Sequence, residues 1–163
     1  MSRRVREGAA PRAHTPAELA RYSGPLLLDT HIWLWLVEGD ETRLTNEAWG
    51  LLDRSAAESN LIVSDISCWE VAVKASKGKL PLTADAAAWL ERAEQAPGIR
   101  FQPLTRKILL RSTQLPGAVH NDSADRILMA TAQLLGIPLV TADRQIIAYA
   151  RAHVGVQVVD VRR

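Results

Sequence analysis

The sequence has little of what secreted and membrane-spanning proteins require. Its 163 residues include a single cysteine, Cys68, which excludes an internal disulfide and agrees with a reducing compartment. No apolar run approaches the roughly 20 residues that a membrane-spanning helix needs. The arginines near the N-terminus are not followed by an apolar segment, so they do not form a secretory signal. We therefore expect a cytoplasmic protein without a membrane partner.

Several catalytic motifs are absent as well. Gly78-Lys79 lacks the rest of a phosphate-binding loop, and the chain has no glycine-rich dinucleotide fingerprint. Its four histidines do not have the spacing of zinc ligands. Neither Cys68 nor any serine has an evident histidine partner, which leaves covalent catalysis with little support.

Charge of one sign is not in large excess, but it is unevenly placed. The formal net charge is +2, and residues 1–24 hold five arginines against two glutamates. The rest of the chain carries 15 basic and 16 acidic side chains, so it is close to neutral. The basic segment either neutralises the phosphates of a polyanion or is a solvated extension. We favour the second interpretation and expect a flexible, basic N-terminal extension over residues 1–24.

Apolar strands and amphipathic helices alternate along the remainder. With 47% apolar and 23% charged residues, the composition is that of an ordinary globular domain, which we place at residues 25–163. Short buried strands are predicted at residues 26–28, 60–64, 99–103, 138–141 and 156–159. Helices are predicted at residues 30–37, 45–58, 66–77, 83–95, 105–114, 122–135 and 144–153. This alternation predicts an α/β fold with a mainly parallel sheet flanked by helices.

Two of the predicted strands end on an aspartate. Three leucines lead to Asp29, and the apolar run from residue 138 leads to Asp143. In open α/β sheets, ligands bind at the carboxyl ends of the strands, where both carboxylates would lie. Asp29 is therefore a candidate metal ligand. The alternative is a helix cap, because Asp29 or Thr30 stands directly before the predicted helix.

Two more acids lie near the starts of predicted helices. Glu70 borders the core, and Lys74 follows four residues later, so the two also suit an ordinary surface ion pair. Asp125 would fall at the third helical position if Asp122 is the cap, and the helix dipole alone favours an acid there. Arg126 either pairs with a carboxylate or reaches a phosphate.

Four carboxylates that converge at one sheet edge cannot all stay ionised without a cation. Hard oxygen ligands select Mg²⁺ or Mn²⁺. Such ions lower the pKa of a coordinated water and stabilise the oxygen that leaves a phosphodiester. His31 stands two residues past Asp29 and could line such a site, although we favour a packing or capping role for it.

Five stretches of the chain carry a family resemblance. They are LDTH at residues 28–31, SDISCWEVAVK at 64–74, GKL at 78–80, DSADR at 122–126 and LVTAD at 139–143. Over about residues 25–160 these stretches resemble, in order and spacing, the PIN domain, and more narrowly the VapC-type toxins of bacterial toxin–antitoxin pairs.

The resemblance implies a Mg²⁺- or Mn²⁺-dependent endoribonuclease with a five-stranded parallel sheet in a three-layer fold. The acids that match the family's catalytic, metal-holding residues are Asp29, Glu70, Asp125 and Asp143. Thr30 and Thr141 match hydroxyl residues beside the site, and Lys74 matches a basic position on the following helix. The family also implies an RNA substrate, a homodimer, and a small VapB-like antitoxin whose tail occupies the site.

Asp65 departs from the family pattern, which usually has a small residue at this position. It either adds a fifth carboxylate near the metal or caps the helix, and we favour the cap. Two other functions remain as rivals of the nuclease. A phospho-accepting signalling domain would need adjacent acids after the first strand, where only Asp29 stands. In a catalytically silent binding module, the acids would only cap helices.

Overall fold

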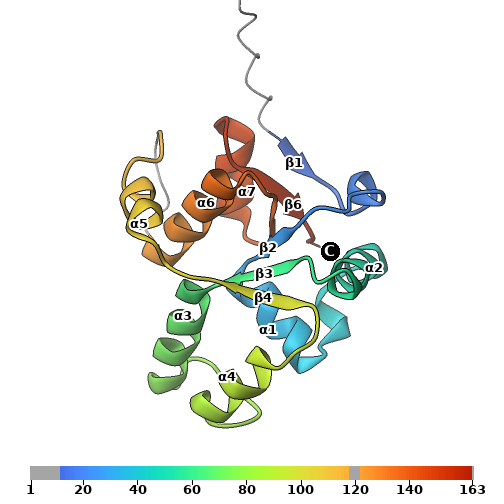
Figure 1. Cartoon of the computed structure of the whole chain (residues 1–163), viewed down its shortest axis with the longest axis vertical. Helices are drawn as coiled ribbons and strands as arrows, with labels where there is room; N and C mark the ends of the chain where they lie inside the picture. Colours follow the sequence, from blue (N-terminus) through green and yellow to red (C-terminus); the bar gives the residue numbers. More distant parts are fainter. Residues whose placement is uncertain (1–11, 118–121, 163) are drawn as a thin grey trace, which may run out of the picture.

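The computed structural model describes residues 12–117 and 122–162. Its strands form one parallel sheet in the order β1-β6-β5-β2-β3-β4 (Figure 1). The strands are β1 (Arg12–His14), β2 (Leu26–Leu28), β3 (Leu61–Ser64), β4 (Ile99–Gln102), β5 (Leu139–Thr141) and β6 (Gln157–Asp160). The helices are α1 (Thr30–Glu38), α2 (Asn46–Ala57), α3 (Asp65–Ser76), α4 (Ala86–Glu94), α5 (Arg106–Ser112), α6 (Ser123–Leu135) and α7 (Arg144–Ala152). Short 3₁₀ turns occur at η1 (Ala17–Leu19) and η2 (Glu41–Arg43).

The central strand β2 divides the core into two halves. Leu26 and Leu28 pack with α1, α2 and α4 on one face, whereas Leu27 packs with α6 and α7 on the other. This division follows from the alternation of side chains along a strand. All three leucines are fully buried. The half of the core that holds Leu26 and Leu28 also contains Trp33. The Trp33 ring packs edge-on against the Trp89 ring, with 5.0 Å between the ring centroids. The α/β class and the parallel sheet that the sequence predicts are confirmed.

The sheet has six strands, whereas the sequence analysis expected five. The additional strand, β1, pairs in parallel with β6, and His14 lies opposite Val159. It comes from the segment that the sequence analysis set apart as an extension. Residues 1–11 lie outside the described part, so the flexibility expected for that extension stays a prediction, as does the division at residue 24.

Because all strands run in the same direction, their carboxyl ends meet along one edge of the sheet. Thr15 follows β1, Asp29 follows β2, and the 142–144 segment follows β5. Asp160 is the last residue of β6. The topology therefore brings together side chains that are far apart in sequence, as is typical of ligand sites in parallel α/β sheets.

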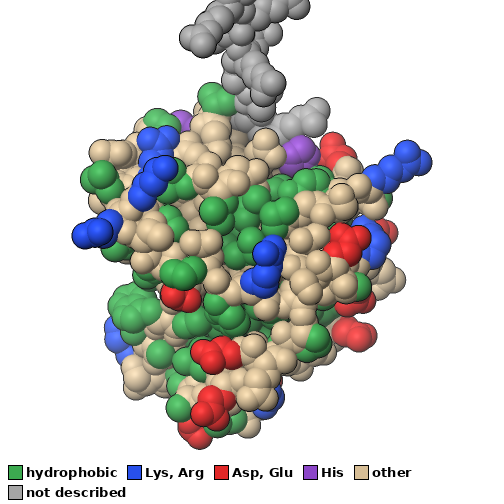
Figure 2. Space-filling view, viewed as in Figure 1, with side chains coloured by type: hydrophobic (Ala, Val, Ile, Leu, Met, Phe, Trp, Pro, Cys, Tyr) green, Lys and Arg blue, Asp and Glu red, His purple; other side chains and the backbone are tan. Residues whose placement is uncertain are grey.

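Four large hydrophobic side chains stay exposed on helices of one side of the molecule. Trp69 of α3 is 58% exposed, and Leu109 and Leu110 of α5 are 42% and 61% exposed. Leu135 at the end of α6 is 41% exposed. Figure 2 shows hydrophobic side chains reaching the surface where α3 and α5 lie. Within residues 12–117 and 122–162, no helix combines the length and apolar character needed to cross a membrane.

Candidate metal centre

Asp29 occupies the N-cap position of α1 but does not cap that helix. None of the N–H groups of α1 donates to its carboxylate. Its Oδ2 instead accepts a hydrogen bond of 2.6 Å from Thr141 Oγ1, across the junction of β2 and β5. The side chain is only 4% exposed. The capping alternative is therefore wrong for Asp29, and an acid is buried here at an energetic cost that the helix does not offset.

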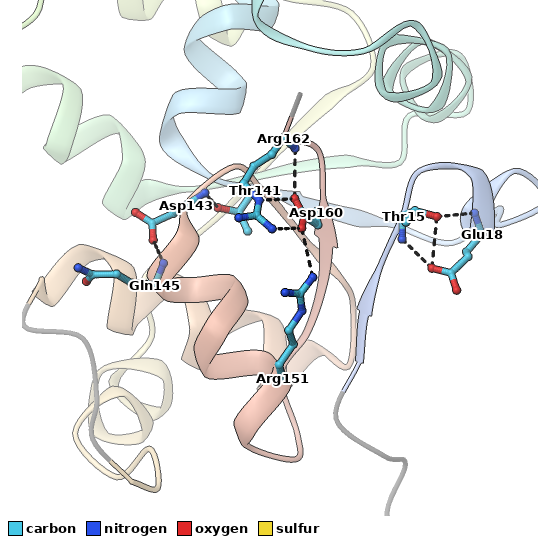
Figure 3. A network of polar contacts seen from close by, with 8 residues as sticks. All are labelled: Thr15, Glu18, Thr141, Asp143, Gln145, Arg151, Asp160 and Arg162. Carbon is cyan, nitrogen blue, oxygen red and sulfur yellow. Dashed lines mark hydrogen bonds and ion pairs between the residues drawn. The ribbon is translucent and has the colours of Figure 1, made fainter.

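Thr141 joins two of the acids. Its hydroxyl donates to Asp29 and accepts a 3.0 Å hydrogen bond from the backbone N–H of Asp143. The Oδ1 of Asp143 in turn caps α7, accepting from the N–H groups of Gln145 at 2.7 Å and Ile146 at 3.0 Å (Figure 3). One carboxylate oxygen of Asp143 thus fixes the start of α7. The side chains of Asp29 and Asp143 are both held at the end of β5, Asp29 by the Thr141 hydroxyl and Asp143 by the helix that it caps.

Glu70 lies on α3 and is 7% exposed. Its Oε2 stands 3.3 Å from Lys74 Nζ, so the ion pair indicated by their spacing is present. The start of α3 is bound to the start of α1, because the Thr30 hydroxyl donates to Ser67 Oγ at 2.8 Å. Both partners of this bond are buried. Lys74 is thus paired with Glu70, and Thr30 joins α1 to α3, whereas their roles beside a metal stay predictions.

Asp125 lies in the first turn of α6, which Asp122 caps as expected by accepting from the N–H groups of Ala124 and Asp125. The pKa of Asp125 is raised to about 8, first by burial and then by the negative charge of Asp29 and Asp122. Asp143 and Glu70 add to the same effect. Burial and, after it, the surrounding negative charge thus both disfavour the ionised form of this carboxyl group.

Burial is also the main cause that raises the pKa of Asp29, with smaller contributions from Glu70 and Asp143. The Thr141 hydrogen bond and the nearby His31 act in the opposite direction. The carboxylates of Asp29, Glu70, Asp125 and Asp143 therefore act on one another electrostatically, although they come from four separate elements. We call this group of four acids the acidic pocket. His31 is exposed, yet it is close enough to influence Asp29, a role that its sequence position alone did not establish.

The four acids line this pocket without forming a closed ligand cage. Within the described residues, no three His, Cys, Asp or Glu side chains form a ready-made metal-binding group. Mg²⁺ typically binds one or two carboxylates and keeps several waters, so an open set of carboxylate oxygens fits this ion. The donor set also suits Mn²⁺. A cation would offset the repulsion that raises the pKa values of Asp29 and Asp125.

Some side chains around the pocket differ from expectation. Ser64, rather than Asp65, caps α3, accepting from the N–H of Ile66 at 3.3 Å. Asp65 is exposed in the first turn. Ser67 is a buried neighbour whose role no sequence pattern indicated. The Nε atom of Arg126 is buried and has no hydrogen-bond partner among the described residues. This nitrogen therefore does not bind a carboxylate, one of the two roles that the sequence left open for Arg126.

The chain was compared with known proteins. The family model described as "PIN domain" matches residues 26–152. The chain is 30% identical over 121 residues to Ribonuclease VapC22 of Mycobacterium tuberculosis. The aligned region covers 74% of this chain and 88% of that protein.

Solved structures with the same fold come from toxin–antitoxin complexes. VapBC2 from Rickettsia felis, bound to a DNA fragment from its promoter, aligns with a TM-score of 0.61 at 15% identity, over 83% of this chain and 98% of that chain. A toxin–antitoxin complex from Klebsiella pneumoniae aligns with a TM-score of 0.52 at 25% identity, over 76% and 90%. The resemblance found in the sequence is confirmed, and the chain belongs to the PIN-domain family.

Proposed function

We propose that this protein is a Mg²⁺- or Mn²⁺-dependent endoribonuclease and the toxin of a toxin–antitoxin pair. Membership of the PIN-domain family and the similarity to a protein named as a ribonuclease support the reaction. The toxin–antitoxin complexes among its structural neighbours support the biological role. A toxin that cleaves cellular RNA acts in the cytoplasm, which stays our prediction for the location.

The observation that carries the proposal is the burial of Asp29 at the carboxyl end of β2. Its carboxylate is bound to Thr141 instead of capping α1, and the charges of three other acids act on it or are acted on by it. We assign metal binding to Asp29, Glu70, Asp125 and Asp143. When bound there, a divalent ion supplies an acidified water and stabilises the oxygen that leaves the RNA phosphodiester.

The surrounding side chains orient these acids before any substrate binds. Thr141 fixes the Asp29 carboxylate, and the N-terminus of α7 fixes Asp143. Lys74 offsets part of the negative charge of Glu70 and lies where it could approach a phosphate. Arg126 is next to Asp125, and we assign it to the support of the same pocket. Such preorganisation is what electrostatic stabilisation of a phosphoryl-transfer reaction requires.

Cleavage assays test the proposal directly. Purified protein is incubated with structured and single-stranded RNAs in Mn²⁺, and then with a chelator. We expect cleavage only with the metal, and none by Asp29→Asn. The matched control is Asp65→Asn, which removes an exposed acid outside the pocket and should leave cleavage unchanged. Metal-dependent cleavage by Asp29→Asn would remove the assignment, and cleavage that survives the chelator would remove the metal requirement.

We also propose a homodimer and a small antitoxin partner. The exposed side chains of Trp69, Leu109 and Leu110 form an apolar surface on α3 and α5, which suits a second copy of the chain. Leu110→Glu should shift the protein to a monomer in analytical ultracentrifugation. The matched control is Val154→Glu, which alters an exposed apolar residue beyond the end of α7. An unchanged dimer in Leu110→Glu would place the interface elsewhere.

A further inference from the structure

A groove of about 700 Å³ lies at the carboxyl edge of the sheet, where the residues on either side of Asp143 in the chain line it. We call it the arginine groove, because Arg43, Arg144 and Arg162 line it. Thr15 and Ala17 from the N-terminal segment form another wall. Figure 3 shows Asp143 and Thr15 on opposite sides of this edge, with Asp160 and Arg162 between them. This order agrees with the strand order β5-β6-β1.

The groove is next to Asp143 in the chain. Ala142 and Arg144, the neighbours of Asp143 in the chain, both line it. Much of its wall lies outside residues 26–152, the part that matches the PIN-domain model. Thr15 and Ala17 precede that part, and Asp160 and Arg162 follow it. The groove is therefore built partly by residues inside the matched part and partly by residues outside it.

The charges of the groove are opposite in sign to those of the acidic pocket. Three arginines line the groove against two carboxylates, Glu47 and Asp160. The Asp160 carboxylate is itself bound by Arg162, at 2.6 Å and 2.8 Å, and lies 3.5 Å from Arg151. Among the described residues, no carboxylate pairs with the exposed Arg144, which leaves its guanidinium available to an anionic ligand.

Arg43 is held in place from two sides. Its Nε lies 3.1 Å from Asp40 Oδ2, and its guanidinium stands over the ring of Trp35 at 5.9 Å. An arginine fixed in this way presents its remaining donors with less loss of side-chain freedom. Guanidinium groups suit the phosphodiester anion, because their planar donors match two phosphate oxygens.

We propose that the arginine groove binds the RNA strand on one side of the phosphodiester that is cleaved, and so sets which flanking nucleotides the enzyme accepts. This inference rests on the proposed nuclease function. A strand whose reacting phosphate lies at the acids would pass Arg144 first and then reach Arg162 and the wall formed by Thr15 and Ala17. Binding there neutralises flanking phosphates, which the acidic pocket cannot do.

Binding is measured first, without cleavage. Fluorescently labelled single-stranded RNA of mixed sequence is titrated with Asp29→Asn protein that also carries a groove substitution. Arg144→Ala should weaken binding by up to about tenfold and reduce the salt dependence by about 0.7 in the log–log slope. The matched control is Arg100→Ala. Arg100 is exposed on β4, the outer strand farthest from β1, and its replacement should change neither the affinity nor the salt dependence.

A steric variant separates the shape of the groove from its charge. Ala17→Trp fills the groove without removing a charge, whereas Ala20→Trp alters an exposed alanine of the same segment that does not line the groove. We expect Ala17→Trp to weaken RNA binding and Ala20→Trp to leave it unchanged. Thermal unfolding of both variants shows whether each is folded.

Cleavage then gives the direction of the strand. An RNA that the wild type cleaves is shortened stepwise from its 5′ end or from its 3′ end. We expect shortening from one end to reduce kcat/KM, and this loss should disappear in Arg144→Ala and Ala17→Trp. If both groove variants bind and cleave like wild type, the inference is overturned while the nuclease assignment stands. If the wild type binds RNA through the groove but never cleaves it with Mn²⁺, the proposed function fails instead.

Discussion

Replacing Thr141 with valine tests the link between β2 and β5 on which the candidate metal centre depends. The two side chains have nearly the same shape, so the change removes the hydroxyl with little change in packing. Thr141 is fully buried, donates to Asp29 at 2.6 Å and accepts from the Asp143 N–H at 3.0 Å. The substitution therefore removes both bonds at once.

The size of the effect follows from these two bonds. A hydrogen bond to a charged group contributes about 1.5–3 kcal/mol, and a neutral one about 1 kcal/mol. The added methyl group of valine recovers about 1 kcal/mol through apolar burial. We expect Thr141→Val to lower the free energy of unfolding by about 1.5–3 kcal/mol. For a chain of this size, that corresponds to a fall in Tm of roughly 3–12 °C.

Urea denaturation in the presence of a chelator measures this loss. The matched control is Thr131→Val in α6, where the hydroxyl of a fully buried threonine donates to the Ile127 carbonyl 2.7 Å away. That carbonyl lies within the helix, so the control should cost about 1 kcal/mol or less. Equal losses for Thr141→Val and Thr131→Val would refute the idea that Thr141 holds the acids in place.

Three further outcomes follow from the structure. Asp29→Asn should stabilise the metal-free protein at neutral pH, because burial raises the pKa of Asp29 and so disfavours its ionised form in the folded state. Urea denaturation measures the difference, and a variant less stable than wild type would contradict this expectation. Burial, together with the charge of Asp65, raises the pKa of the Cys68 thiol to about 11. Alkylation of Cys68 by iodoacetamide near pH 8 should therefore be slow in the folded protein and faster after unfolding. Rapid labelling of the folded protein would contradict this expectation. The bonds from Arg162 lower the pKa of Asp160, so its stabilising effect is complete above the ordinary value of 3.8 and is lost as the pH falls through the folded-state pKa. Asp160→Asn should therefore be less stable than wild type at pH 7 in thermal unfolding, with a difference that shrinks in acid.

The acids could be predicted because each is marked by a local pattern. An apolar strand that ends on Asp29, and another that leads to Asp143, identify a sheet edge from the sequence alone. The same patterns could not tell whether Asp29 caps the following helix. The structure excludes that cap, because the Asp29 carboxylate accepts a hydrogen bond from Thr141, which is 112 residues away in the chain. The role of the acids as metal ligands stays a prediction. The cap of α3 was misassigned because Ser64, the last residue of β3, also starts the helix.

The sixth strand and the arginine groove had no comparable signal. β1 has only three residues, and its strand conformation depends on pairing with β6 rather than on its own composition. The groove is lined by residues from four separate segments of the chain, 15–17, 43–47, 142–144 and 160–162. Such sites arise from the order of strands in the sheet, which the alternation of strands and helices did not specify.

The parallel pairing of β1 with β6 has a practical consequence for how this protein is handled. The chain enters β1 at the amino edge of the sheet and leaves β6 at the carboxyl edge, where Arg162 lines the groove. The described part of the chain therefore begins, at residue 12, on the side away from the acids. A tag fused after residue 163 would begin at the mouth of the groove and compete with any ligand there, so N-terminally tagged protein is the better material for RNA work.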